Sequence, residues 1–458
     1  MKHLFFITFI FVAIHQSNAQ CWETVKSCYD QTAALRSDGT IWNWGFNQGG
    51  LLGNGSQESN CIAPTQIGND SDWKFVTVGA GFGFGIRTNG TLWAWGGNDY
   101  GQLGTGTTDN SLVPVQVGTD SDWEYVSAGF GNTKAIKTNG TLWSWGWNNA
   151  GVQGNGGWDN VLSPAQTGTD SDWKMVSVGD NCALALKNDG SLWSCGSNDV
   201  GQLGIGSTVD QHQFVQVGTN TNWNYIAISI NAGMSTRCLA TKTDGTLWYW
   251  GRNAFDIQDD YLTSPQQLGT ESDWKEVGLG SQVTYMATKT NGTLWAWGLN
   301  TFGSTVGDGT TIDQTEPVLI NNTASWSLPS TGLAHSTAIQ NGVIYSWGAN
   351  SHGQLGLGTT TMHYGTPQAM DSMNCSLHLN ENKFSLEVYP NPVNGQLHLH
   401  ISGSNPVDKI IITSISGQQV LLKEDVSTDI DVRTLVPGSY FIHVFSGNNE
   451  YQQLFIKE

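Results

Sequence analysis

The stretch Asn89-Gly-Thr-Leu-Trp-Ala-Trp-Gly96 decides the fold, because close copies of it occur six more times along the chain. The copies span residues 38–45, 139–146, 189–196, 244–251, 291–298 and 341–348. A second landmark is a Trp that opens a predicted strand, found at Trp22, Trp73, Trp123, Trp173, Trp223, Trp274 and Trp326. These Trp residues follow one another at steps of 50 to 52 residues. The chain therefore contains seven copies of one structural unit.

Each unit has the chemistry of four short strands. Residues 73–78 alternate large apolar and polar side chains, which is the period of a half-buried strand. Asn89-Gly90 separates two further strand-like runs, and both residues tolerate the positive φ angles of a type I′ hairpin turn. Another strand starts at Pro114. Four strands in about 50 residues predict a propeller blade, so we expect an all-β, seven-bladed β-propeller over residues 20–370.

The ring has to close where the seventh unit meets the first. The seventh unit ends with Pro367-Gln-Ala-Met370. From the phase of the repeats, we expect this last strand to complete the first blade, which would hide both free sheet edges.

The composition agrees with this fold and limits the partners. Only 12% of the residues are charged, whereas Gly occurs 57 times and Trp 21 times. Disordered chains lack aromatic residues and helical ones tolerate Gly badly, so the mixture favours short strands joined by Gly-rich turns. The formal net charge is −19, and an acidic surface repels phosphate backbones. We therefore expect no nucleic acid partner.

Residues 1–19 have the features of a signal peptide. Lys2 and His3 precede an apolar run over residues 4–14, and Ser17-Asn-Ala19 is a small-x-small cleavage site. Cleavage between Ala19 and Gln20 would release the mature chain. No later segment approaches the roughly 18 continuous apolar residues of a membrane span, so we expect no transmembrane segment in the mature chain.

Export permits disulfide bonds, and the seven cysteines are an odd number that leaves at least one thiol unpaired in a monomer. Two pairings are open. Cys182 and Cys195 could meet across a hairpin, and Cys21 with Cys375 could tie the two ends of the propeller. No Cys or His spacing indicates zinc, and we expect neither a metal nor a cofactor.

The seven units resemble regulator of chromosome condensation repeats. Blade seven carries the motif most fully, in Ser346-Trp-Gly348 and His352-Gly-Gln-Leu-Gly-Leu-Gly358. The resemblance covers roughly residues 21–370 and implies the family's seven-bladed propeller. It also implies structural roles for His335 and His352, because the family repeat has His at these positions. One local departure is Cys195, which stands in blade four where the second Trp belongs.

Residues 371–383 form a predicted linker, after which the composition changes. Strands that alternate with turn signals predict a small Ig-like β-sandwich over residues 384–458. Tyr389-Pro-Asn-Pro392, Ser416-Gly-Gln418 and the Leu-x-x-Gly-x-Tyr pattern at 435–440 resemble the type A C-terminal sorting domain of the type IX secretion system. This resemblance implies a Bacteroidetes-type bacterium, handling by the type IX machinery, and export to the cell surface or the surroundings.

Of the 21 Trp residues, Trp147 and Trp158 alone lie outside the repeat positions. The other Trp side chains are expected to pack between blades. The alternative is a light-absorbing Trp cluster, since the plant ultraviolet-B photoreceptor has this repeat fold. Trp147 and Trp158 are better candidates for a contact surface, because Trp is enriched at interface hot spots.

The predicted binding surface consists of the variable loops that precede the last strand of the blades. The loops span residues 56–61, 107–112, 157–162, 209–213, 256–262 and 359–364. The candidate contact residues of the binding surface are Trp147, Trp158, Asn160, Tyr261 and Tyr364.

Two short motifs have a functional and a plain interpretation. Asp120-Ser-Asp122 and its copies at residues 70–72, 170–172 and 271–273 each precede the Trp that opens a blade. An Asx turn that caps the incoming strand explains them, and a calcium site is the alternative. Ser372, within Asp371-Ser-Met373, matches a three-residue Bacteroidetes O-glycosylation pattern.

The sequence contains no nucleophile elbow, zinc-protease helix or phosphate loop. We therefore expect that the protein is not an enzyme. We expect a secreted or cell-surface binding module, whose loops engage an extracellular protein or glycan. One alternative is a carbohydrate-active or other surface hydrolase with dispersed carboxylates, and another is an extracellular enzyme inhibitor. The nucleotide exchange on a small GTPase that is known in the repeat family is not carried over, because export removes that substrate.

Overall fold

The computed structural model describes residues 21–458, apart from ten short segments. These are residues 231–235, 253–260, 281–283, 301–302, 371–384, 390–391, 403–407, 415–418, 424–428 and 447–448. The chain divides into two compact units, Met1–Cys375 and Ser376–Glu458. The predicted signal peptide, its cleavage site and the predicted linker with Ser372 lie outside the described residues. No helix in the described part of the chain has the length and apolar character that a membrane span requires.

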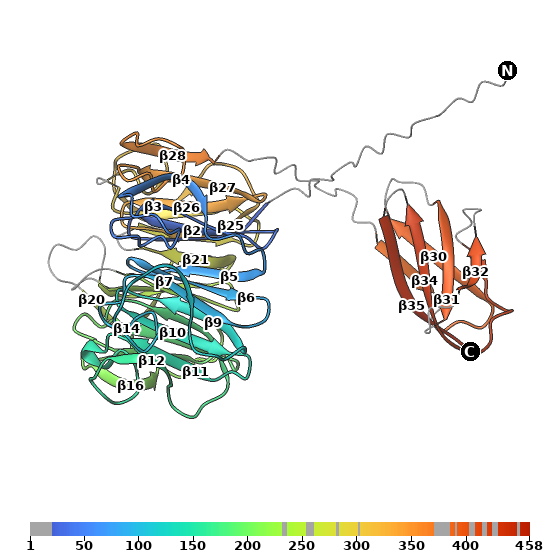
Figure 1. The fold of residues 1–458 in the computed structure, drawn as a ribbon, viewed down its shortest axis with the longest axis horizontal. Coiled ribbons are helices and arrows are strands. Elements are labelled where there is room, and N and C mark those ends of the chain that lie inside the picture. Colours follow the sequence, from blue (N-terminus) through green and yellow to red (C-terminus); the bar gives the residue numbers. More distant parts are fainter. Residues whose placement is uncertain are drawn as a thin grey trace, which may run out of the picture. The chain divides into compact units, whose positions relative to one another are not determined.

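The first unit is the predicted seven-bladed propeller, with one four-stranded antiparallel sheet per blade (Figure 1). Blade one is β1 (Trp22–Cys28), β2 (Gln31–Arg36), β3 (Ile41–Phe46) and β4 (Asn60–Gln66). Blade two is β5 (Trp73–Val78), β6 (Phe82–Arg87), β7 (Leu92–Gly96) and β8 (Ser111–Gln116). Blade three is β9 (Trp123–Ala128), β10 (Asn132–Lys137), β11 (Leu142–Gly146) and β12 (Val161–Gln166), with the 3₁₀ turn η1 (Asn149–Gly151).

The remaining blades follow the same order. Blade four is β13 (Trp173–Val178), β14 (Cys182–Lys187), β15 (Leu192–Gly196) and β16 (Gln211–Gln216). Blade five is β17 (Trp223–Ile228), β18 (Arg237–Lys242), β19 (Leu247–Arg252) and β20 (Tyr261–Leu268). Blade six is β21 (Trp274–Leu279), β22 (Thr284–Lys289), β23 (Leu294–Gly298) and β24 (Gln314–Ile320). Blade seven is β25 (Trp326–Thr331), β26 (His335–Gln340), β27 (Val343–Ala349) and β28 (His363–Ala369).

The ring closes without exchange of a strand, so the predicted pairing of the last strand with the first blade is wrong. β28 pairs with β27 of its own blade, and β4 completes blade one. Blade one lies beside blade seven (Figure 1) and is joined to it by lateral contacts. The Trp22 amide donates to the Gly342 carbonyl at 2.9 Å, and Ser27 Oγ lies 2.9 Å from Thr337 Oγ1. In each repeat unit, the fourth strand pairs with the third strand of the same unit. A unit that begins at the strand-opening Trp therefore forms one complete blade.

The second Trp of the Trp-x-Trp pair fills the space between neighbouring blades. Trp145 is fully buried, and its Nε1 donates to the carbonyl of Gln102 in blade two at 2.8 Å. A Cβ atom on Gly104 would lie 2.8 Å from the same Nε1, so the Gly-rich turn needs Gly there. Equivalent bonds run from Trp44, Trp250 and Trp347 to Gln354, Gln202 and Thr305. The packing interpretation of these Trp residues is confirmed.

The hairpin between the second and third strands differs from the predicted type I′ turn in six blades. In blade two the Gly90 amide donates to the Arg87 carbonyl at 2.9 Å, and Gly90 has φ 81° while Asn89 stays at negative φ. This is a type I turn closed by a left-handed Gly. Asn89 Oδ1 instead accepts hydrogen bonds from the Thr91 amide and hydroxyl, at 3.0 and 2.7 Å. In blade seven, Asn341 and Gly342 both have positive φ, as predicted.

The predicted disulfide between Cys182 and Cys195 is wrong, because both thiols are free. Cys195 pairs with Ala183 in the ladder, so its side chain and that of Cys182 point to opposite faces of the sheet. Cys21 is disulfide-bonded, and its predicted partner, Cys375, lies outside the described residues. The thiols of Cys61 and Cys238 are also free.

The second unit is a β-sandwich. One sheet contains β29 (Ser385–Tyr389), β30 (Gln396–Ser402) and β33 (Asp429–Asp431). The other contains β32 (Gln419–Lys423), β31 (Lys409–Ser414), β34 (Gly438–Ser446) and β35 (Asn449–Lys457). Residues of both sheets, among them Leu397, Ile412 and Ile442, share one apolar core. Tyr440 of the Leu-x-x-Gly-x-Tyr pattern is buried there, and its hydroxyl donates to the Val436 carbonyl at 2.8 Å.

Candidate binding surface

The connections of a blade alternate between the two faces of the propeller, because its four strands run antiparallel. One face carries the loops between the first and second strands and between the third and fourth strands. We call it the loop face. The opposite face carries the hairpins and the connections between blades, and we call it the turn face. The candidate loops predicted from the sequence belong to the loop face, apart from residues 256–260, which lie outside the described residues.

In the six blades whose loop is described, one Asn shapes the loop before the fourth strand. In blade three, Asn148 Oδ1 accepts from the Gln153 amide at 2.9 Å, and its Nδ2 donates to the carbonyls of Gly157 and Asp159 at 3.0 and 3.1 Å. The Asn148 amide donates to Asn160 Oδ1 at 3.0 Å. Asn160, predicted as a contact residue, therefore holds the loop in shape.

Four aromatic side chains form a row on the loop face. Phe130 lies 6.2 Å from Tyr29 and 6.1 Å from Trp147 between ring centroids, and Trp147 stacks on Tyr100 at 5.2 Å with 23° between the ring planes. Each of the four side chains is half-buried. Gly131 makes room for the stack, because a Cβ atom there would lie 2.9 Å from the Tyr100 ring. This aromatic row joins loops of blades one, two and three.

Trp158 lies apart from the aromatic row and is 61% exposed. Its ring meets the ring of His212 edge-on at 4.0 Å. The Gly156 amide also donates to the His212 carbonyl at 2.8 Å. The loop of blade three thus rests on β16 of blade four and presents Trp158 to solvent.

The structure does not bring the other two predicted contact residues to this place. Tyr261 opens β20 of blade five and is 40% exposed. Tyr364 belongs to β28 of blade seven, where hydrogen bonds from Thr361 and Thr359 lower the pKa of its hydroxyl. In the described part of the chain, the ring of Trp147 contacts Tyr100 and Phe130, and no ring contact joins it to Tyr261 or Tyr364.

Tyr29, Phe130 and Tyr100 were not predicted from the sequence. Their only signal in the sequence is that each is an aromatic residue at a loop position where other repeats have a small or polar one. For example, Phe130 stands where blades two and four have Ala80 and Asp180. The row is completed only in the folded ring, where the loops of blades one and three come close to each other.

The turn face holds a Lys or Arg between two Trp rings in each of blades one to six. In blade three, Lys137 Nζ lies 4.8 and 4.5 Å from the ring centroids of Trp123 and Trp143. The same amine lies 2.7 and 3.0 Å from carboxylate oxygens of Asp120 and Asp122. Burial lowers the pKa of Lys137, but hydrogen bonds and the charges of both carboxylates outweigh it and raise the pKa overall.

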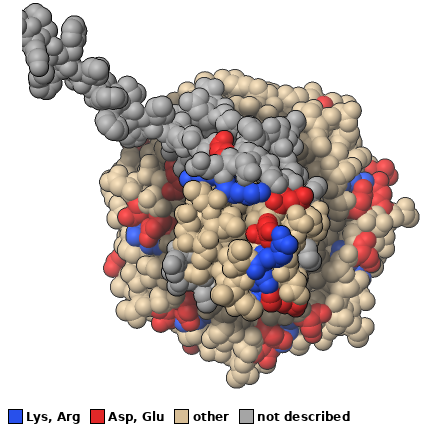
Figure 2. Space-filling model, turned by 90° about the vertical axis from the view of Figure 1, so that its right-hand side faces the viewer, with Lys and Arg blue, Asp and Glu red and all other residues tan. Residues whose placement is uncertain are grey.

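In these four blades the acidic pairs are therefore partners of a protein cation, a role that neither the strand-cap nor the calcium interpretation included. Arg87, Lys187 and Lys289 are paired in the same way. Among the described residues, no cluster of three or more His, Cys, Asp or Glu side chains could hold a metal. In the part of the surface visible in Figure 2, Lys and Arg side chains lie beside Asp and Glu in small groups.

The structural role of the two repeat-position His residues is visible in blade seven. His335 is fully buried, and its Nε2 lies 2.9 Å from Thr32 Oγ1 of blade one. Burial lowers the pKa of His335 to about 3, so it is neutral at physiological pH. His352 packs edge-on against Phe46 of blade one at 5.0 Å. Both side chains thus help to close the ring.

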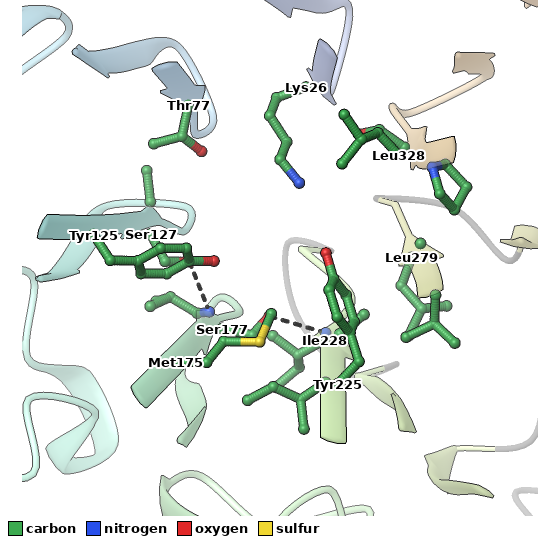
Figure 3. A pocket seen from close by; sticks show the side chains of 18 of the residues that line it. Lys26, Thr77, Tyr125, Ser127, Met175, Ser177, Tyr225, Ile228, Leu279 and Leu328 are labelled. Carbon is green, nitrogen blue, oxygen red and sulfur yellow. Dashed lines mark hydrogen bonds between the residues drawn. The ribbon is translucent and has the colours of Figure 1, made fainter. Parts of the chain in front are cut away.

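The first strands of the seven blades surround a cavity of about 560 Å³ (Figure 3). The described residues that line it include Lys26 and Lys174 but no carboxylate. A glycoside hydrolase needs two carboxylates roughly 5–9 Å apart, and this lining does not supply them. The hydrolase alternative therefore stays a prediction, and this cavity does not offer it a catalytic site.

Comparison with family models finds both parts of the chain. The Regulator of chromosome condensation (RCC1) repeat matches residues 38–86, 89–136, 139–186, 189–229 and 341–376, and a second model of this repeat matches residues 73–102 and 174–202. The Secretion system C-terminal sorting domain matches residues 387–458. Both resemblances inferred from the sequence motifs are thereby confirmed.

Curated relatives match over short stretches. Human E3 ubiquitin-protein ligase HERC2 is 35% identical over 82 residues, which is 17% of this chain and 2% of that protein. The Ultraviolet-B receptor UVR8 of Arabidopsis thaliana is 33% identical over 84 residues, which is 18% of this chain and 19% of the receptor. This chain therefore matches less than a fifth of either relative.

Solved structures show the same fold over most of the propeller. Prp20p from Saccharomyces cerevisiae superimposes with a TM-score of 0.64 and 19% identity, over 78% of this chain and 88% of that chain. Human WBSCR16 gives a TM-score of 0.63 and 20% identity, over 72% and 93%. At these identities the likeness concerns the fold alone.

Proposed function

Because this chain is a propeller of regulator of chromosome condensation repeats followed by a secretion system C-terminal sorting domain, we propose that it is an exported binding module for a protein outside the cell. The sorting domain indicates export by the type IX system to the surface or the surroundings. The propeller is the part that binds, and its loop face is the contact surface.

The observation that carries this proposal is the aromatic row with exposed Trp158 beside it. Half-buried aromatic rings fixed by their neighbours lose little conformational freedom on binding and offer large apolar contact area. Trp and Tyr are enriched among the residues that dominate protein interfaces. Trp147 and Tyr100 are already stacked in the unbound chain, so a partner meets a surface that is prepared for contact.

Relatives with this fold support a protein as the ligand. Prp20p has been described together with its binding to Gsp1p and histones, and Kap60 has been seen bound to yeast RCC1. These partners belong to the yeast protein. An exported chain meets a different set of proteins, and only the use of the propeller as a protein-binding scaffold is taken from the relatives.

The test measures binding of the labelled mature protein to intact cells of the native host. Phe130→Ala removes the centre of the aromatic row, and Trp158→Ala removes the exposed ring. We expect Phe130→Ala to weaken binding by about tenfold or more, the effect of about 1.4 kcal/mol. Val113→Ala, an exposed apolar side chain on the outer strand β8, is the matched control and should bind like the wild type.

Treatment of the cells identifies the kind of ligand. Protease treatment should abolish binding, whereas periodate oxidation of glycans should leave it intact. Loss of binding after periodate alone would replace the protein ligand by a glycan. Equal binding by Phe130→Ala, Trp158→Ala and Val113→Ala would rule out the aromatic row as the contact surface. If the captured partner is an enzyme that loses activity on binding, the inhibitor alternative is supported.

A further inference from the structure

The axial cavity has the size of a small-molecule site. Its volume of about 560 Å³ falls within the range of roughly 300–1,000 Å³ that such pockets occupy. Its wall is made by the inner strands β1, β5, β9, β13, β17, β21 and β25. Blade-to-blade hydrogen bonds fix this wall, since the amides of Val178 and Ile228 donate to Ser127 Oγ and Ser177 Oγ at 3.2 Å each.

The cavity is cationic although the chain as a whole carries a net charge of −19. Lys26 and Lys174 are the charged residues in the described lining, and neither forms an ion pair with a described residue. Glu23 and Glu124 lie on the inner strands outside this lining, and so does Glu276. The Glu276 carboxylate contacts Lys275 at 3.2 Å and accepts from the Leu328 amide at 2.8 Å.

Three hydrogen-bond donors converge inside the cavity. Figure 3 shows the Lys26 amine and the hydroxyl oxygens of Tyr125 and Tyr225 directed toward its middle. Burial raises the pKa of both Tyr hydroxyls to about 12, so each keeps its proton at neutral pH. A protonated hydroxyl and an ammonium group are the donors that an anionic oxygen requires.

The rest of the lining is largely apolar. Phe75 packs against the Tyr125 ring at 5.3 Å, and Met175, Leu279 and Leu328 line further parts of the wall. A half-buried ammonium group without a protein carboxylate loses hydration that an anionic ligand would replace. A ligand for this cavity thus needs one negative end and an apolar body.

We propose that the axial cavity binds a small organic carboxylate with an apolar body. Lys26, Tyr125 and Tyr225 hold the carboxylate, and Phe75, Met175 and Leu328 contact the body of the ligand. This site lies inside the propeller, so it is independent of the aromatic row and of the protein ligand proposed for the loop face.

Decanoate is a suitable probe, titrated calorimetrically into the purified mature chain. We expect one site per chain. Lys26→Met keeps the length of the side chain and removes the ammonium, so affinity should fall by about tenfold or more, the usual value of a charge-assisted hydrogen bond. The control is Lys74→Met, because Lys74 lies on the inner strand β5 but is paired with Glu124 at 3.0 Å and does not line the cavity.

Two further measurements separate charge recognition from general apolar binding. Decanol and decyltrimethylammonium have the same body without the negative end, and both should bind at least about tenfold more weakly than decanoate. Tyr225→Phe keeps the ring, removes the hydroxyl, and should weaken decanoate binding severalfold. Thermal unfolding of each variant confirms that it is folded.

The proposal is overturned if decanoate does not bind to the folded wild type. It is also overturned if Lys26→Met and Lys74→Met bind decanoate equally, or if the cationic analogue binds as tightly as decanoate. None of these outcomes concerns binding to host cells, so a failure here is distinct from a failure of the protein-binding proposal.

Discussion

Two lysines on one strand show how position decides the chemistry of a side chain. Lys137 and Lys134 lie three residues apart on β10, so they point to opposite faces of the sheet. Lys137 sits between two Trp rings beside two carboxylates, and its pKa is raised. Lys134 is buried between blades, donates to the Gln153 carbonyl at 3.0 Å, and has its pKa lowered to about 8 by burial.

Lys134 is therefore expected to lower the stability of the propeller at neutral pH. Between pH 8 and its ordinary pKa of 10.5, the unfolded chain binds a proton that the folded chain does not, so the free energy of unfolding rises with pH. Below pH 8 the folded chain holds a buried ammonium at a cost of about 3 kcal/mol. Lys134→Met removes this charge, while the Gln153 carbonyl still accepts from Ser144 Oγ at 3.1 Å.

We expect Lys134→Met to raise the free energy of unfolding at pH 7 by about 1–3 kcal/mol, with a gain that shrinks as the pH rises toward 10. Urea unfolding of the variant and the wild type at pH 7 and pH 9.5 measures this. Lys137→Met is the contrasting variant and should destabilise, because it breaks the contacts to Asp120 and Asp122. A loss of stability for Lys134→Met that is equal at both pH values would contradict the prediction.

At the scale of the element, blade four replaces two repeat residues together. Cys195 stands where the other blades have the buried second Trp, and Phe214 stands where they have the Pro of the fourth strand. The Phe214 ring lies 5.2 Å from that of Trp173. A Cβ atom on Gly154 would lie 3.0 Å from Phe214 and 3.2 Å from Cys195 Sγ. The aromatic ring thus reaches the space between blades from the fourth strand.

Restoring one repeat residue alone should therefore overpack blade four. We expect Cys195→Trp to lower the free energy of unfolding by about 1–3 kcal/mol, because Phe214 occupies part of the space. Cys195→Trp combined with Phe214→Pro returns both positions to the repeat pattern and should recover most of that loss. Denaturant unfolding of the wild type, Cys195→Trp, Phe214→Pro and the double variant gives the coupling energy, and strictly additive effects would show that the two positions are independent.

At the scale of the whole molecule, the propeller is a ring of complete blades with no exchanged strand. Every blade is connected to the next by a short segment such as residues 118–122, except at the junction of blades seven and one. That junction relies on lateral contacts, including a buried cluster that contains Trp22, Trp44, Ile344 and Met370. The fold of the propeller should therefore not depend on where in the ring the chain begins and ends, as long as each blade stays whole.

A circular permutant tests this description. In the isolated propeller, residue 370 is joined to Trp22 through a copy of residues 118–122, Gly-Thr-Asp-Ser-Asp, and new ends are placed between blades three and four at residue 169. We expect cooperative unfolding within a few degrees of the parent propeller, because every blade stays whole. A second permutant, opened in the hairpin between β14 and β15, splits a blade and should unfold at lower temperature. Equal melting temperatures for the two would contradict the role of whole blades.

The sequence by itself determined the number of blades, the four strands in each, and the change of domain after residue 370. These features follow from local rules, since side-chain alternation, Gly-rich turns and a fixed repeat length act within about 50 residues. It also pointed to Trp147 and Trp158, because departures from a repeat are visible without a structure.

Only the tertiary structure decided which side chains meet across the ring. The aromatic row combines Tyr29, Tyr100 and Phe130 with Trp147, and Lys26 faces Tyr125 and Tyr225 across the cavity. The physical reason is that closure of the ring brings together residues 50 to 200 positions apart, and their distances depend on the radius and register of all seven blades. No local pattern in the chain contains that information.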